Sequence, residues 1–95
     1  TLADLDLSID LNLREVKYKG SNVPLTKMEF NLLRFFAENP NKVYTREELL
    51  DRVWGLEAFP TTRTVDMHVA QLRKKITSEP FETVRGSGYI FRVKT

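Results

Sequence analysis

One stretch of the sequence carries side chains suited to contacting an anionic polymer. If residues 63–76 form a helix with about 100° per residue, one narrow stripe is apolar, made of Val65, Val69, Leu72 and Ile76. The opposite face mixes cations, an amide, a methyl group and a thioether, without a carboxylate: Arg63, Met67, Ala70, Gln71 and Lys74. In a DNA major groove, cations meet phosphates, glutamine pairs with adenine and methyl-sized groups touch thymine. On this stretch alone, a surface helix with a few basic residues is an equally good interpretation.

Length and composition describe one small domain. The 95 residues are 41% hydrophobic and include no cysteine, which excludes disulfides and cysteine-based metal sites. No apolar run approaches the roughly 20 residues that cross a bilayer, and no signal-peptide pattern opens the sequence. Residues 63–95 carry seven cations and three anions, whereas residues 1–62 carry eight cations and ten anions. Basic charge gathered at one end favours a polyanion or an acidic membrane surface as the partner over a small substrate.

The first 25 residues have the alternation of β-strands. Apolar and polar residues alternate from Leu5 to Leu11, and turn-forming residues separate this run from residues 15–18 and 23–25. We therefore predict an antiparallel meander of three strands. Pro24 lacks an amide hydrogen, so the third strand should lie at an edge or end there. Nothing in this segment predicts a ligand site.

Two helices are predicted from the same Thr-x-x-Glu capping box. The first box starts a helix at Thr26 that runs to about Glu38, with a core face of Phe30, Leu33, Phe36 and Ala37. The second box, at Thr45, starts a short helix that Gly55 ends, with an apolar side of Leu49, Leu50, Val53 and Trp54. The indole N–H of Trp54 needs a partner, so packing inward and donating outward to an anion are equally supported.

A third helix and a hairpin complete the chain. Thr61 or Thr62 is expected to cap the third helix, whose positive N-terminal end attracts phosphate. The hairpin pairs residues 81–84 with 89–93 across Arg85-Gly86-Ser87-Gly88. An arginine on such a thin tip suits a narrow groove of negative potential. Taken alone, however, a solvated hairpin arginine is the better interpretation.

The elements combine into an α+β fold of the winged helix-turn-helix type. We predict an N-terminal β-sheet over residues 1–25, a three-helix core over residues 26–77 and a C-terminal wing hairpin over residues 81–94. In this arrangement the third helix enters the major groove and the wing reaches the adjacent minor groove or backbone.

Several motifs in this order resemble the C-terminal effector domain of OmpR/PhoB-type response regulators. The resemblance covers the chain from about Leu5 to Val93. It is carried by Leu25-Thr26-x-x-Glu29-Phe30-x-Leu32-Leu33, Val43-Tyr44-Thr45-Arg46-Glu47-x-Leu49-Leu50, Val53-Trp54-Gly55, Arg63-Thr64-Val65-Asp66-x-His68-Val69-x-x-Leu72-Arg73-Lys74-Lys75 and Thr83-Val84-Arg85-Gly86-x-Gly88-Tyr89.

The resemblance implies a cytoplasmic transcription regulator of a two-component system. Its expected partners are double-stranded DNA carrying tandem direct repeats, a second copy bound head-to-tail, RNA polymerase, and an N-terminal receiver domain that these residues do not include. The polymerase contact is expected in the loop from Gly55 to Thr62, at Leu56, Glu57, Ala58 and Phe59.

The same resemblance implies a role for each candidate DNA-binding residue. Phosphate contacts are expected from Arg46, Trp54, Arg63, Thr64, His68 and Tyr89. Ala70, Gln71 and Lys74, with the neighbouring Met67, are expected to face the bases or the groove edge. Arg85 is expected to enter the minor groove. Arg73 is open between a DNA contact and a structural pair with Asp66 on the same helix edge. Many family members have arginine at the place of Ala70 or Gln71, so no base preference carries over.

Two other kinds of function are compatible with parts of the sequence. A winged helix can be a protein-interaction module, here through Met67, Ala70 and Phe59, and a regulator can stand alone or be tethered to a membrane without a receiver. With one histidine, no cysteine and no P-loop, the sequence predicts no enzyme, cofactor or metal site.

Overall fold

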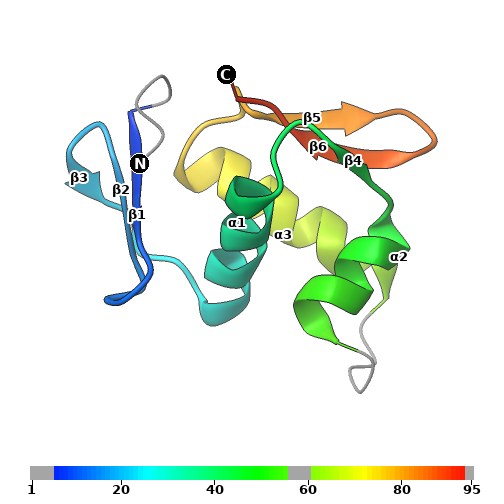
Figure 1. The fold of residues 1–95 in the computed structure, drawn as a ribbon, viewed down its shortest axis with the longest axis horizontal. Coiled ribbons are helices and arrows are strands. Elements are labelled where there is room, and N and C mark those ends of the chain that lie inside the picture. The colour runs from blue at the N-terminus through cyan, green and yellow to red at the C-terminus, as the bar shows by residue number, and fades with distance from the viewer. Residues whose placement is uncertain (1–5, 56–60, 94–95) are drawn as a thin grey trace.

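Two antiparallel sheets flank a group of helices in the computed structural model, which describes residues 6–55 and 61–93 (Figure 1). The elements in chain order are β1 (Leu7–Asp10), β2 (Glu15–Tyr18), β3 (Ser21–Asn22), α1 (Lys27–Glu38), β4 (Val43–Tyr44), α2 (Arg46–Leu49), η2 (Leu50–Trp54), α3 (Thr62–Lys75), β5 (Phe81–Val84) and β6 (Gly88–Phe91). In the view of Figure 1, helix α1 lies between the N-terminal sheet and α2, and it packs against α3. The architecture confirms the α+β, winged-helix prediction.

The N-terminal sheet is the predicted meander, with strand order β1-β2-β3. Its third strand was placed wrongly, because it comprises Ser21–Asn22 and not residues 23–25. The turn explains the difference: Lys19 and Gly20 both have positive φ, of 52° and 81°, so pairing resumes immediately after a two-residue turn. Leu11 does not continue the buried alternation either, since it follows β1 in a turn and is 48% exposed.

Helix α1 begins at the predicted capping box and ends at Glu38. The Glu29 amide donates to Thr26 Oγ1 at 3.2 Å, and the Thr26 amide donates to Glu29 Oε1 at 2.9 Å. The predicted core face differs at two residues: Leu32 is buried although it was not included, and Ala37 is only half-buried. Helix α1 packs against several neighbouring elements, so a wider arc of it is covered than a one-sided helix requires.

The second capping box starts α2, and the turn continues as the π-helix η2 up to Gly55. Gly55 has a φ of 92°, as expected for the residue that stops the helix. The strand β4, immediately before this box, was not predicted from the sequence. It has only two residues, too few to show alternation, and its partner β6 is distant in the chain.

Helix α3 buries the predicted stripe: Val65, Val69 and Leu72 are each 0% exposed, and Ile76, which follows the helix as its C-cap, is 8% exposed. It packs against α1 and α2. Thr61 occupies the N-cap position, as one of the two predicted alternatives. Its side chain, however, makes no capping hydrogen bond. The first amides of α3 therefore lack the side-chain partner that the other two helices have.

The C-terminal sheet has the order β4-β6-β5, which places β6 in its centre. The predicted hairpin is present, but its second strand spans Gly88–Phe91 and not residues 89–93. Three aromatic rings join this sheet to α1: the centroid of Phe91 lies 5.9 Å from that of Phe36 and 5.2 Å from that of Phe81. The wing is thus anchored at its base in the core of the domain.

The close approach of β4 to β6 requires glycine at position 88. A Cβ on Gly88 would lie 2.0 Å from the carbonyl oxygen of Tyr44, whereas a Cβ on Gly86 would meet nothing within 4 Å. We expect Gly88→Ala to lower the free energy of unfolding by about 3 kcal/mol or more, because backbone atoms must move. Gly86→Ala should cost about 1 kcal/mol from its positive φ alone. Urea denaturation measures both; equal losses would show that the β4–β6 contact yields easily.

Candidate nucleic-acid interface

The residues that were predicted to point outward from α3 lie on its exposed face. All five residues of this face are exposed: Arg63, Met67, Ala70, Gln71 and Lys74. Met67 is 61% exposed although it is apolar. We call these five residues the α3 face. Because the opposite stripe is fully buried, the α3 face is held outward by core packing.

Thr64, His68 and Trp54 flank the α3 face and are half-buried. Nδ1 of His68 lies 2.8 Å from the carbonyl oxygen of Thr64, and the His68 ring meets the Trp54 ring edge-on with centroids 5.0 Å apart. A carbonyl oxygen only accepts, so Nδ1 carries the hydrogen and Nε2 is the ring atom available to an outside partner. Within residues 6–55 and 61–93 the Trp54 indole makes no hydrogen bond, which leaves its N–H for an external acceptor.

Asp66 receives two hydrogen bonds on one oxygen. Arg46 Nε donates to Asp66 Oδ1 at 2.7 Å, and the Tyr89 hydroxyl donates to the same oxygen at 2.6 Å. Burial raises the pKa of Tyr89, and the hydrogen bond to Asp66 raises it further, so the phenol keeps its proton. Of the two alternatives left open for Arg73, the pair with Asp66 does not form, because Asp66 bonds to Arg46 and Tyr89 while Arg73 bonds to β5.

Arg73 holds the wing. Its Nε and Nη2 donate to the carbonyl oxygen of Phe81 at 3.2 and 2.8 Å, and Nη2 also donates to Thr83 Oγ1 at 2.8 Å. The guanidinium lies over the Tyr89 ring, 5.7 Å from its centroid. These contacts give Arg73 a structural role, and a DNA contact from it remains a prediction.

The wing tip presents a cation to solvent. Arg85 is exposed and follows β5 directly, in the turn that Gly86 completes with a φ of 76°. Tyr89, by contrast, is only 6% exposed. Of the wing residues predicted to contact DNA, Arg85 is thus free and Tyr89 is largely covered by its neighbours.

A cavity of about 250 Å³ lies between α3 and the start of α1 and is lined by Thr26, Glu29, Met67, His68, Ala70 and Gln71. The Glu29 carboxylate, which is 5% exposed, accepts a 2.6 Å hydrogen bond from Lys75 Nζ. Burial acts to raise the pKa of Glu29, but the bonds from Lys75 and from the Thr26 amide outweigh it and leave the pKa below its usual value. This pair could not be predicted from local sequence patterns, because its partners are 46 residues apart.

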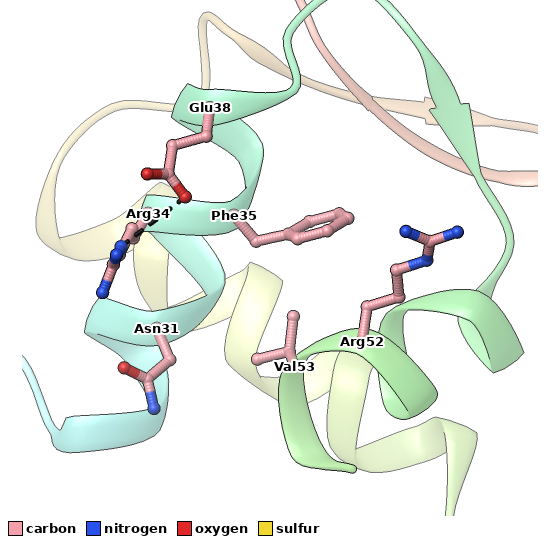
Figure 2. A pocket seen from close by; sticks show the side chains of 6 residues that line it. All are labelled: Asn31, Arg34, Phe35, Glu38, Arg52 and Val53. Atoms are coloured by element: carbon pink, nitrogen blue, oxygen red, sulfur yellow. Dashed lines mark ion pairs between the residues drawn. The ribbon is translucent and has the colours of Figure 1, made fainter.

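A second depression, of about 200 Å³, is formed by α1 and η2 without any predicted DNA-binding residue (Figure 2). Arg34 and Glu38 form an ion pair at 3.5 Å on its α1 side, and Phe35 and Val53 point into the space between the helices. Both charges of this pair are largely exposed, which makes it a weak interaction.

Some expectations cannot be placed on the structure. The predicted polymerase-contact residues Leu56, Glu57, Ala58 and Phe59 lie outside the described residues. In the parts of the chain that are described, no helix has the length and apolar character to cross a membrane, and no cluster of three metal-ligating side chains occurs.

Comparison with known proteins identifies relatives of this domain. The family model described as "Transcriptional regulatory protein, C terminal" matches residues 20–91. The chain is 55% identical over 84 residues to the transcriptional regulatory protein VxrB of Vibrio cholerae, an alignment that covers 88% of this chain and 34% of VxrB. The chain therefore spans about a third of the length of that relative.

Solved structures of similar fold belong to the same group. The OmpR/PhoB homologue DrrB of Thermotoga maritima is 39% identical with a TM-score of 0.83, over 92% of this chain and 42% of that one. The DNA-binding domain of RstA from Klebsiella pneumoniae, solved in complex with the RstA box, is 32% identical with a TM-score of 0.80, over 92% of this chain and 91% of that one. The chain belongs to the OmpR/PhoB family of response regulators and is a winged-helix DNA-binding domain of that family.

Proposed function

We propose that this domain recognises a specific sequence in double-stranded DNA by placing the α3 face in the major groove and Arg85 in the neighbouring minor groove. The observation that carries the proposal is the composition of the α3 face. It offers cations at both ends and an amide between them, and none of its five residues is acidic. Its residues are turned outward by a fully buried stripe, so they can reach base edges without any change in fold.

Phosphate contacts are assigned to Arg63 at the N-terminal end of this face and to Thr64, His68 and Trp54 beside it. These side chains lie near the N-terminal half of α3, where the helix dipole also favours an anion. His68 would donate to a phosphate from Nε2, and this requires the doubly protonated ring, because Nδ1 already carries the hydrogen that bonds to the Thr64 carbonyl. Arg46 retains the Nη groups of its guanidinium, since only Nε bonds to Asp66 among the described residues.

The wider assembly is proposed from the family. A full-length protein would carry a receiver domain, bind tandem direct repeats as a head-to-tail pair, and contact RNA polymerase through residues 56–59. Such a regulator would act in the cytoplasm, where the chromosome is. The family is one of DNA-binding regulatory domains and not of enzymes.

Selection of bound duplexes from a random DNA pool tests the repeat arrangement. We expect the domain to enrich two copies of one short motif in the same orientation, spaced by about one helical turn. Enrichment of inverted repeats would contradict the head-to-tail arrangement. A pool that remains random after repeated rounds would contradict sequence-specific recognition itself.

Salt dependence separates DNA binding from protein interaction. With roughly six phosphate contacts, affinity for the selected duplex should fall about a thousandfold between 50 and 200 mM salt. Fluorescence anisotropy with a labelled duplex measures this slope. A protein-interaction module acting through Met67 and Ala70 would instead bind its partner with little dependence on salt, so a flat slope would count against the phosphate contacts assigned above.

Two classes of substitution separate base contacts from phosphate contacts. Gln71→Ala should relax the preference at one base pair by about 1–3 kcal/mol. Arg63→Ala should weaken binding to all sequences similarly and reduce the salt slope by about one. Glu79→Ala, at an exposed position beyond α3, is a matched control that should leave binding to the selected duplex close to that of the wild type. If Gln71→Ala weakens every sequence equally, Gln71 does not read a base.

A further inference from the structure

Asp66 is a carboxylate within a surface that is proposed to bind a polyanion. It lies on α3 and is 39% exposed, next to the exposed Arg46. By charge alone such a group opposes binding of phosphates. Its two hydrogen bonds indicate a structural contribution that can offset this repulsion.

The single oxygen Oδ1 of Asp66 joins three elements. It receives Arg46 from α2 and Tyr89 from β6, while Asp66 itself belongs to α3. The Arg46 guanidinium is thereby fixed through Nε, which leaves its terminal nitrogens to contact a phosphate. The Tyr89 hydroxyl donates its hydrogen bond to Asp66, so in this conformation it has no hydrogen left to donate to DNA.

Arg73 supplies a second connection seven residues further along α3. It binds β5 at the carbonyl of Phe81 and at Thr83 Oγ1. Seven residues are about two helical turns, so Asp66 and Arg73 lie on the same side of α3 and hold the hairpin at two separate points. Arg85 comes two residues after Thr83, immediately beyond the strand that Arg73 holds.

We propose that Asp66 and Arg73 are positioning residues that fix the wing relative to the α3 face, so that Arg85 and the α3 face engage adjacent grooves of one duplex. The proposal rests on the proposed function. It gives Asp66 a favourable effect on binding of the specific duplex, opposite in sign to the effect of its charge.

Two substitutions at Asp66 separate position from charge. Asp66→Ala and Asp66→Asn remove the same charge, but only asparagine keeps an oxygen that accepts from Tyr89 and Arg46. Binding is measured by anisotropy with the duplex selected by the wild-type domain and with a shuffled duplex of equal length. We expect Asp66→Ala to weaken binding of the selected duplex by about tenfold, with Asp66→Asn in between, while neither weakens binding of the shuffled duplex. If both variants bind the selected duplex more tightly than the wild type, Asp66 acts only as a repulsive charge and the proposal is wrong.

Double variants that combine Asp66→Ala with Arg85→Ala test directly whether Asp66 positions the wing. In the wild-type background Arg85→Ala should weaken binding of the selected duplex by about tenfold, and in Asp66→Ala by less than about threefold, because a displaced wing tip has little contact to lose. If Asp66 stabilised the fold without positioning the wing, Arg85→Ala would weaken binding equally in the wild-type and Asp66→Ala backgrounds. Equal costs, or no cost in the wild type, would overturn the proposal.

Thr83→Val keeps the proposal testable if Asp66→Ala fails to fold, which thermal denaturation followed by circular dichroism reveals. It removes an acceptor of Arg73 at an exposed position and is nearly isosteric. The Arg85→Ala cost should shrink in this background as well, and an unchanged cost would overturn the proposal. Should the wild-type domain bind the selected duplex with Arg63 dependence while these couplings are absent, the proposed function stands and only the anchoring role fails.

Discussion

The burial of one stripe of α3 determines what the rest of this domain can do. Val65, Val69 and Leu72 are removed completely from water, and each contributes about 1.5–3 kcal/mol of hydrophobic free energy through that burial. Rotating α3 to present another face would expose this stripe, so core packing and the choice of outward side chains are one constraint. The burial of this stripe fixes the orientation of α3, and the other helices, the sheets and the wing pack around it.

Local patterns in the sequence were sufficient for most of the fold. Both capping boxes appear where Thr26 and Thr45 predicted them, because the pattern that encodes such a box spans only four residues. The apolar stripe of α3 was equally clear from spacing. By contrast, β4 was missed, since a two-residue strand exists only through its pairing with β6 and has no pattern of its own.

The exposure of the α3 face was predictable from the sequence, whereas the contacts of the side chains beside it were not. The exposure of the α3 face follows from periodicity, and the structure agrees. The partners of Asp66 could not be found in this way, because Arg46 and Tyr89 lie 20 and 23 residues from it in the chain. Proximity on one helix edge suggested Arg73 instead, but neighbouring elements offered each side chain a better partner.

The ion pair between Glu29 and Lys75 couples two helix ends. Glu29 completes the capping box of α1, and Lys75 is the last residue of α3, so one carboxylate secures both termini. Helix ends ordinarily fray one residue at a time with little free-energy cost. Here, opening the final turn of α3 leaves a buried carboxylate without its cation, which penalises the first turn of α1 as well. Backbone amides at these two distant ends should therefore exchange with solvent as one cooperative unit.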